Sequence, residues 1–349
     1  MVAFIKKGGY HVNYYVGCDL HSNNVVLGVI NDKGQRIYKR KVPNLIKAVL
    51  LEMEPFKDNT VGVVVESTFN WYWLVDGMME AGYKLHLANP AAIKQYEGLK
   101  HTDDYHDAFH LANLLLLGIL PEGYIYPKEQ RALRDLSRKR SMQVQQRSAQ
   151  IISFQSLYYR QKGCKFRSDH IKKLKVEDVD GLFKDPYIDL AGKSHVCIIT
   201  ALTQQIQAIE QELFRSMKLQ PQFKCLKTVY GIGDILALII ALETGDISRF
   251  PKVGNYASYC RCVSSQRISN EKKKGHNNRK NGNKHLAWAF VEAANFAKRH
   301  YPDAQRFYQR KLAKTNKTVA IKALAHKLAR ASYFVMRDRI EFKPERAFG

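Results

Sequence analysis

Two short apolar runs near the N-terminus, each ended by a carboxylate, constrain the fold of this chain more than any other feature. Residues 14–18 lead into Asp19, and residues 61–65 lead into Glu66. Short, nearly all-apolar runs of this kind are typical of strands buried on both faces of a sheet. The ends of such strands are where open α/β sheets place their sites. We therefore expect Asp19 and Glu66 to share one edge of a sheet.

A second pair of acids opens a helical stretch further along the chain. Asp104 and Asp107 are three residues apart and so share one helix face. Four carboxylates gathered together would repel one another unless cations neutralised them, and oxygen ligands suit Mg²⁺ or Mn²⁺. Two such ions about 3.5–4 Å apart would stabilise the attacking and leaving oxygens of a phosphodiester. Each acid alone also fits a turn or a first helical turn, but their order together favours a metal site.

The order of the predicted elements indicates a fold class. The predicted strands are short apolar runs bounded by turn residues: 15–19, 24–30, 36–42, 61–66 and 84–88. The predicted helices begin at Pro43, Trp71 and Asn89-Pro90. Three antiparallel strands followed by alternating strands and helices is the order of the ribonuclease-H-like fold. We expect this mixed α/β domain over residues 1–125.

The charge balance predicts a polyanionic partner. The 349 residues contain 56 Lys+Arg against 32 Asp+Glu, a net charge of +24, while 45% hydrophobic residues exclude a disordered basic tail. Such an excess favours nucleic acid first and an anionic membrane second. No apolar run approaches the ~20 residues that span a bilayer, and the N-terminus lacks the apolar segment of a signal peptide. We expect a cytoplasmic, nucleoid-associated protein with reduced cysteines and no membrane partner.

Residues 126–220 are expected to form a basic helical or coiled-coil linker. Within residues 128–175, 14 Lys/Arg face 3 acids along a thin apolar stripe. This pattern predicts a long helix paired with another helix, from this or a second subunit, although a single solvated helix has the same pattern. Residues 165–193 are irregular, and Val196–Met217 is helical again, which allows a helical hairpin. The cations expected to bind nucleic acid here are Arg138, Lys139, Arg140 and Arg147.

Residues 221–349 are expected to form a third, mainly helical domain. Tyr230-Gly231-Ile232-Gly233 between two helical stretches has the sequence form of a helix-hairpin-helix. Backbone N–H groups of Gly231 and Gly233 at such a helix start can hold a phosphate without contacting bases. A plain tight turn has the same sequence.

A basic loop follows, in which residues 261–284 hold 8 Lys/Arg and 1 acid. Its cations expected to bind nucleic acid are Arg267, Lys272, Lys273, Lys274, Arg279 and Lys280. Solvation explains the charge, but not the small hydroxyl of Ser269 among these cations just before the helix predicted over 285–297. Cations around a serine stabilise its alkoxide and the phosphorane it forms, so Ser269 is a candidate nucleophile towards a phosphodiester.

These residues resemble a known family. Asp19, Glu66 and the run Lys100–Ala108 are similar to the DEDD transposases of bacterial insertion sequences, the RNA-guided recombinases called bridge-RNA or seek-RNA systems. The C-terminal half resembles them in 230–233, 243–250 and 281–286. The resemblance implies a RuvC-like N-terminal domain, a coiled-coil linker and a C-terminal transposase domain with a catalytic serine. Its implied partners are the DNA of the element ends and target, a non-coding guide RNA, and a dimer or tetramer in which the acids of one subunit face the serine of another.

The resemblance also assigns the nucleophile. The family serine usually precedes glycine, and alignment through Tyr259 and Lys272 places Ser269, followed by Asn270, at that position. Ser264 and Ser265 are the fallback nucleophiles. In the acidic run, Asp103 precedes Asp104, and the D-x-x-D-Ala spacing favours Asp104 with Asp107.

We therefore expect a Mg²⁺-dependent, RNA-guided DNA transposase. A Holliday-junction resolvase or other structure-selective nuclease would use the same acids with water as nucleophile and would need no serine. A non-catalytic basic nucleic-acid-binding protein explains the charge but leaves the ordered acids unexplained.

Overall fold

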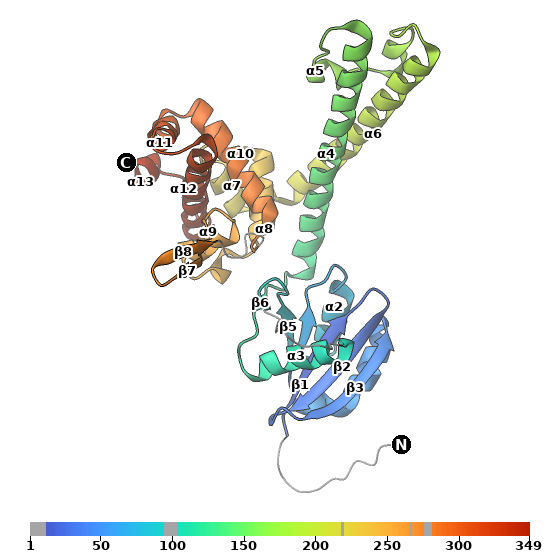
Figure 1. Cartoon of the computed structure of the whole chain (residues 1–349), viewed down its shortest axis with the longest axis vertical. Helices are drawn as coiled ribbons and strands as arrows, with labels where there is room; N and C mark the ends of the chain where they lie inside the picture. The colour runs from blue at the N-terminus through green and yellow to red at the C-terminus, as the bar shows by residue number, and fades with distance from the viewer. Residues whose placement is uncertain (1–11, 94–102, 218–219, 266, 276–280) are drawn as a thin grey trace. The chain divides into compact units, whose positions relative to one another are not determined.

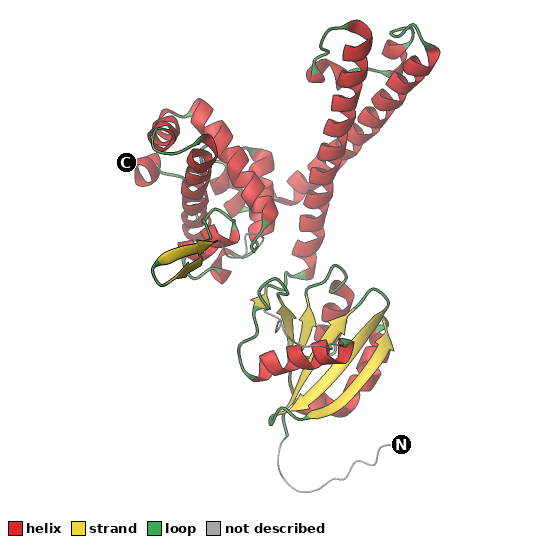
Figure 2. Cartoon of the chain, viewed as in Figure 1, coloured by secondary structure: helices red, strands yellow, loops and turns green. Residues whose placement is uncertain are grey.

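The computed structural model describes residues 12–93, 103–217, 220–265, 267–275 and 281–349. The chain divides into two compact units, residues 1–128 and 129–349. The N-terminal unit is a mixed sheet with helices, whereas the C-terminal unit is mostly helical (Figure 2). This confirms the predicted fold class at that level. The limits expected for three domains, 1–125, 126–220 and 221–349, stay a prediction.

The N-terminal sheet has the order β3-β2-β1-β4-β5-β6. Its strands are β1 (Tyr14–Leu20), β2 (Asn24–Asn31), β3 (Arg36–Pro43), β4 (Thr60–Glu66), β5 (Leu85–Ala88) and β6 (Glu122–Gly123). The first three strands pair antiparallel, and β4 and β5 join them parallel. This arrangement is consistent with a ribonuclease-H-like domain. The predicted strands form within a residue or two of their expected limits, whereas β6 is too short to leave a sequence pattern.

The helices of this unit differ more from the prediction. They are α1 (Ile46–Met53), the 3-10 helix η1 (Glu54–Asn59), α2 (Tyr72–Glu80) and α3 (Asp104–Leu116). The prediction that Pro43 opens a helix is wrong, because Pro43 is the last residue of β3 and the helix begins three residues later. Residues 89–92 form a turn, and the rest of the helix predicted from Asn89-Pro90 lies outside the described residues.

Helices cover both faces of this sheet (Figure 1). Val16, Cys18 and Leu20 of β1 share a core with side chains of α1 and α2. Successive strand residues point to opposite faces, so the alternate residues Gly17 and Asp19 face α3. The period-2 pattern of β1 thus places a carboxylate on the face that α3 covers.

Two glycines let α3 lie directly on the sheet. Gly17 and Gly28 are paired in the register of β1 and β2. A Cβ atom at Gly17 would lie 1.8 Å from the carbonyl oxygen of Ala108, and one at Gly28 would lie 3.0 Å from the ring of Phe109. The absence of side chains at this pair allows the helix backbone to approach β1 and β2.

We predict that Gly17→Ala destabilises the N-terminal unit by about 1–3 kcal/mol, because the added methyl group would force α3 away from β1. Urea denaturation, with hydrogen exchange of the α3 amides reporting on this unit, measures the effect. Gly123→Ala is the control, since its Cβ would lie no closer than 3.4 Å to any neighbour. Equal stability of the two variants would contradict this packing.

The C-terminal unit begins with a helical hairpin. Its long helices are α4 (Lys128–Lys162) and α6 (Pro186–Met217), joined through α5 (Ser168–Ile171) and the 3-10 helix η2 (Val176–Val179). Arg140 contacts Glu210 and Arg147 contacts Thr203, so residue numbers fall on α6 as they rise on α4 and the helices are antiparallel. Pairing within one chain is therefore observed, whereas pairing with a second subunit stays a prediction.

The start of α6 corrects the expected helix over 196–217. The helix begins ten residues earlier, at Pro186, and the carboxylate of Asp185 accepts hydrogen bonds from the backbone N–H groups of Tyr187 and Ile188. An acid followed by proline is a usual start signal for a helix. The charged composition of the segment obscured that signal.

The remaining elements form one apolar core. They are α7 (Pro221–Leu226), α8 (Asp234–Thr244), the 3-10 helix η3 (Ile247–Arg249), α9 (Val253–Tyr259), α10 (Lys284–His300), α11 (Pro302–Leu312), α12 (Lys317–Asp338) and α13 (Pro344–Phe348). The strands β7 (Arg267–Ser269) and β8 (Lys272–Gly275) pair with each other and contribute no described residue to this core. None of the helices in the described part of the chain combines the length and apolar character that crossing a bilayer would need.

Candidate metal centre and serine hairpin

Strands β1 and β4 bring the first two predicted acids to one sheet edge. Their parallel register pairs Gly17 with Val64, so Asp19 and Glu66, each two residues further on, lie at the ends of neighbouring strands. Val64 packs against Leu111 of α3. Because side chains two apart share a face, Glu66 lies on the same face as Asp19.

The first turn of α3 supplies the other two acids. Asp103 is the N-cap residue, and its Oδ1 accepts a hydrogen bond of 2.7 Å from the backbone N–H of His106. Asp104 and Asp107 then occupy the first helical turn. The neighbouring aspartates thus have different tasks, with Asp103 capping the helix and Asp104 facing the sheet edge.

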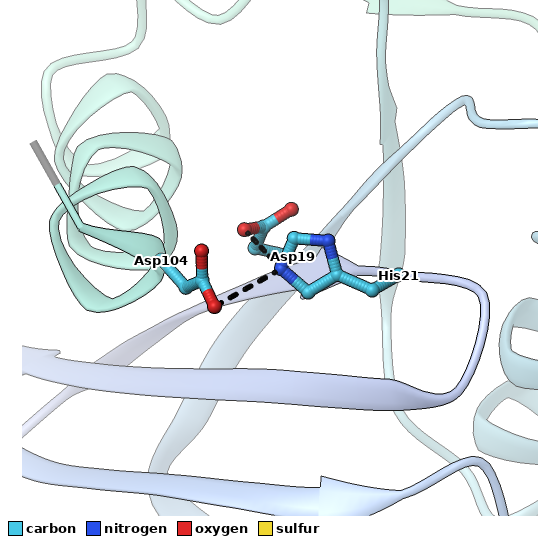
Figure 3. Close-up of side chains that lie close together, drawn as sticks. All are labelled: Asp19, His21 and Asp104. Atoms are coloured by element: carbon cyan, nitrogen blue, oxygen red, sulfur yellow. Dashed lines mark ion pairs between the residues drawn. The ribbon is translucent and has the colours of Figure 1, made fainter.

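His21 joins this cluster (Figure 3). Its Nε2 lies 3.1 Å from Oδ2 of Asp19 and 3.5 Å from Oδ2 of Asp104. One ligand atom from each of the three residues lies within 4.8 Å of the others. The backbone carbonyl of His21 accepts hydrogen bonds from the side-chain amides of Asn44 and Asn70, at 3.1 and 2.9 Å. These two amides hold the segment that carries His21 at the strand end.

Sequence reasoning missed His21 and Lys41, which also lies near the cluster. His21 follows Asp19 by two residues, and that spacing in extended chain places both on one face. Lys41 of β3 lies 3.4 Å from Oδ2 of Asp104. Strand periodicity was the available signal for His21, whereas Lys41 reaches the cluster only through the packing of α3.

The four predicted acids influence one another electrostatically. Burial raises the pKa of Asp19, which is 7% exposed, and the charges of Asp107 and Asp104 raise it further against the opposing effect of His21. Burial likewise raises the pKa of Glu66, and the charges of Asp19 and Asp107 add to the shift. Burial and mutual repulsion therefore disfavour the ionised forms of Asp19 and Glu66, and a bound cation would stabilise them.

The donor set fits a divalent cation. Asp19 and Asp104 offer the carboxylate oxygens that Mg²⁺ and Mn²⁺ prefer, and His21 adds an imidazole nitrogen. Asp107 stands near enough for its charge to raise the pKa of both Asp19 and Glu66, and the charge of Asp19 raises the pKa of Glu66.

Asp19→Asn should stabilise the protein by about 0.5–2 kcal/mol at neutral pH in EDTA, because it removes a charge that burial and neighbouring acids disfavour. The raised pKa of Asp19 means that its proton is held to higher pH in the folded state. The gain should therefore appear above that pKa and vanish as pH falls through it. Urea denaturation across pH measures this dependence.

Asp103→Asn is the matched control, and it should leave stability nearly unchanged because asparagine caps helices as well as aspartate. Calorimetric titration with Mn²⁺ should show weakened binding for Asp19→Asn and none of that loss for Asp103→Asn. A loss of stability in Asp19→Asn at neutral pH would contradict the electrostatic account of this site.

Ser269 stands at the turn of a β-hairpin, where a loop was expected. β7 and β8 pair antiparallel, with Ser269 opposite Lys272. Asn270 and Glu271 between them have φ of 50° and 57°, as in the two-residue turns whose twist matches paired strands. Ser269 is exposed. The sequence concealed this hairpin because Asn-Glu lacks the glycine that usually marks such a turn.

The other predicted residues of this loop are placed unevenly. Lys272 and Lys274 of β8 are exposed, as is Ser264, while Ser265 is half-buried. The backbones of Arg267 and Lys273 lie in the hairpin. Arg279 and Lys280 lie outside the described residues.

The two ends of the loop are tied together. The backbone N–H of Asn283 donates to the carbonyl oxygen of Tyr259 at 2.6 Å, and Nε of Arg261 donates to the carbonyl oxygen of Gly282 at 3.0 Å. Gly282 has φ of 92°, and a Cβ atom there would lie 2.5 Å from the carbonyl oxygen of Tyr259. The residues on either side of this loop, Tyr259 and Arg261 before it and Gly282 and Asn283 after it, are thus held together.

The buried carboxylate of Glu243 connects Asn283 to α4, because it pairs with Arg138 of that helix. We call Arg138, Glu243 and Asn283 the Glu243 clasp. Arg138 donates two hydrogen bonds of 2.6 and 2.7 Å to Glu243, and Asn283 Nδ2 donates a third of 2.6 Å. Burial alone would raise the pKa of Glu243, but the hydrogen bonds and charge of Arg138 and the amide of Asn283 hold it below its ordinary value. Asn283 also caps α10. The clasp therefore joins α4, α8 and α10.

Glu243→Gln should destabilise the C-terminal unit by about 1–3 kcal/mol, because it replaces the charged acceptor of the hydrogen bonds from Arg138 by a neutral amide. Urea denaturation of the full chain measures the loss. Glu212→Gln, which breaks the exposed ion pair with Arg215, is the control and should change stability little. Equal small effects in both variants would show that the clasp contributes nothing to stability.

Several predicted nucleic-acid ligands already have protein partners. Arg138 belongs to the Glu243 clasp, Arg140 pairs with Glu210, and Arg147 donates to Thr203. Lys139 is exposed. Their contact with nucleic acid stays a prediction.

The predicted helix-hairpin-helix glycines have distinct surroundings. Gly231 has φ of 77° and packs on α10, where a Cβ atom would lie 2.1 Å from the carbonyl oxygen of Ala293. Gly233 is the N-cap residue of α8, and its missing Cβ would meet nothing within 4 Å. Packing alone explains Gly231, whereas Gly233 leaves the helix start open to a ligand.

Two family models match the chain. Residues 16–158 match a transposase model, that of the DEDD transposases of IS110 elements, and residues 223–309 match the Transposase IS116/IS110/IS902 family. The chain carries IS110-family transposase domains. The first match contains the four acids, and the second contains the serine hairpin and most of the Glu243 clasp.

Two relatives agree with these matches. An uncharacterized 43.6 kDa protein of insertion element IS110 from Streptomyces coelicolor is 24% identical over 152 residues, which are 43% of this chain and 38% of the relative. The putative transposase y4qE from Sinorhizobium fredii is 24% identical over 230 residues, 64% of this chain and 55% of the relative. The matched regions span about two fifths to just over half of these relatives' lengths.

The IS110-like residues of the C-terminal half have clear structural tasks. Glu243 forms the clasp, Gly245 ends α8 with φ of 64°, and the Asp246 carboxylate accepts hydrogen bonds from the backbone N–H and hydroxyl of Ser248. Arg249 donates to the carbonyl oxygen of Thr244 at 3.0 Å. Gly245, Asp246 and Arg249 thus fix the geometry of the turn after α8.

Proposed function

We propose that the chain is an RNA-guided DNA transposase that cuts and exchanges DNA strands with a metal-binding acidic site and a serine nucleophile. The observation that carries this proposal is the convergence of Asp19 and Asp104 with His21 at one sheet edge, within a domain of the DEDD transposase type. Glu66 and Asp107 complete the proposed acidic set. When bound there, Mg²⁺ or Mn²⁺ supplies charge stabilisation to the reacting phosphodiester.

Ser269 is the proposed nucleophile. Its Oγ would form a bond to phosphorus while the bond from phosphorus to the leaving sugar oxygen breaks, and that oxygen would take the proton that Ser269 gives up. The exposure of Ser269 and its place opposite Lys272 support this role. The φ of 50° at Asn270 also suits the alignment, because related chains usually have glycine there and glycine adopts this conformation without strain.

The proposed partners follow from charge and family. A net charge of +24 suits DNA and a structured guide RNA, whose binding should weaken steeply with salt. The exposed Lys139, Lys272 and Lys274 are proposed contacts for these polyanions, together with Gly233 at the start of α8. A dimer or tetramer would let the acids of one subunit serve the serine of another.

The test uses the full chain with DNA of the element ends, target DNA and the element's non-coding RNA. The unaltered protein should cleave DNA in Mg²⁺ and form a covalent protein–DNA adduct, both lost in EDTA. Asp19→Ala should abolish cleavage and retain DNA and RNA binding, because the charges that bind the backbone lie elsewhere. Ser269→Ala should remove the adduct and strand exchange without changing the folding of the chain.

Each result has a clear meaning for the proposal. Recombination by Asp19→Ala at the unaltered rate would overturn the acidic site. Cleavage without an adduct in Ser269→Ala would indicate water as nucleophile and a resolvase-like nuclease, while transfer of the defect to Ser264→Ala or Ser265→Ala would move the nucleophile. Equal activity with random RNA would remove the guide from the proposal.

A further inference from the structure

One side of strand β3 carries a row of cations that faces helix α3. We call Arg36, Lys39 and Lys41 the seam cations, because they lie along the seam between these two elements. All three are exposed at residue level. Among the strands that the structure describes, β3 is the outermost on its side of the sheet. The row is therefore open to solvent along its length.

Two seam cations lie on aromatic rings of α3. The guanidinium carbon of Arg36 is 4.6 Å from the ring centroid of Phe109, and Nζ of Lys39 is 4.7 Å from that of Tyr105. Phe109 and Tyr105 are four residues apart and so lie one helical turn apart on the same face. The rings therefore hold the charged groups themselves in place, while Arg36 and Lys39 remain exposed.

The third seam cation ends the row at the acidic site. Lys41 Nζ lies 3.4 Å from Oδ2 of Asp104, the carboxylate that also faces His21. The row thus runs along β3 in chain order from Arg36 to Lys39 to Lys41 and terminates at the acids. Protection of a sheet edge explains cations on β3, but it does not explain why the row ends at the acidic cluster.

The spacing along the row suits a nucleic-acid backbone. Residues two apart on a strand, such as Lys39 and Lys41, repeat every ~6.6 Å. Neighbouring phosphates of one nucleic-acid strand are separated through space by more than their ~3.4 Å axial spacing, because the backbone winds around the helix axis. Cations on this repeat can therefore meet neighbouring phosphates of a single backbone, and the half-buried Tyr105 beside Lys39 offers an aromatic ring to a base.

We propose that the seam cations bind the backbone of the DNA strand to be cut and direct it to the acidic site. The proposal rests on the proposed function for the identity of the polyanion as DNA and for cutting at the acidic site. Arg36 and Lys39 hold phosphates away from the reacting bond, and Lys41 holds the phosphate beside it. The seam is thus a substrate-positioning surface within the N-terminal unit.

The opposite side of β3 provides a matched control. Arg40 is exposed like the seam cations, but it pairs with Glu52 at 3.7 Å on the side of the sheet that α1 covers. A variant at Arg40 removes the same charge from the same strand. Any effect that depends on net charge alone will appear in Arg40→Gln as well.

The first measurement is photo-crosslinking of the full chain, in EDTA, to a single-stranded oligodeoxynucleotide with one 5-iododeoxyuridine. Mass spectrometry of the adducts should map crosslinks to Tyr105. Lys39→Gln should reduce this crosslink at least fivefold, Lys39→Arg should restore it, and Arg40→Gln should leave it unchanged. The slope of log affinity against log salt should fall by about 1 in Lys39→Gln.

The same oligonucleotide made as RNA is the second arm. A stronger Tyr105 crosslink with RNA would overturn the proposal and assign the seam to the guide. An equal Tyr105 crosslink in Lys39→Gln and Arg40→Gln would overturn it too. Aggregation of Lys39→Gln with unchanged DNA affinity would also overturn it, because the lysine would then only protect a sheet edge. These measurements are made without metal and do not require cleavage. A chain that binds DNA at the seam but cuts no DNA would therefore contradict the proposed function and not the proposal for the seam cations.

Discussion

The close contact between α3 and the paired glycines of β1 and β2 is the constraint on which the N-terminal unit depends. Gly17 and Gly28 remove the two side chains that would hold the helix away from the sheet. Only at that distance does the first turn of α3 bring Asp104 to the end of β1. The same contact lays the rings of α3 beside β3. The positions of the acidic cluster and of the seam cations therefore both depend on the packing of α3 against Gly17 and Gly28.

The sequence predicted what is encoded locally in this molecule. Strand periodicity located β1 and β4 and their terminal acids, because alternation and burial are properties of a few neighbouring residues. Lys41 was missed because its contact with Asp104 needs the approach of α3, which no local pattern specifies. His21 was missed although its position two residues after Asp19 is a local signal that it shares a face with that acid. The hairpin at Ser269 was missed for a local reason, since its turn uses Asn-Glu where glycine is the usual signal.

The two candidate sites handle buried charge in opposite ways. At the sheet edge, Asp19 and Glu66 have raised pKa values because burial and like charges combine against ionisation. In the Glu243 clasp, Arg138 and Asn283 provide enough hydrogen bonds to reverse the effect of burial. Carboxylates whose ionisation is disfavoured lie where a cation is expected to bind, whereas the carboxylate whose charge is balanced by hydrogen bonds joins helices together. This contrast separates residues of chemical interest from residues of structural interest without any functional knowledge.

The Glu243 clasp also connects the C-terminal helices to a point near the start of the long helix α4. Arg138 fixes one point of a helix that continues to Lys162, about 36 Å away at 1.5 Å per residue. Arg140 and Arg147 join this helix to α6 beyond the clasp. A turn of about 10° at the clasp would move the far end by about 6 Å. Displacement of the hairpin tip and reorientation of the residues around Asn283 are thus coupled by geometry.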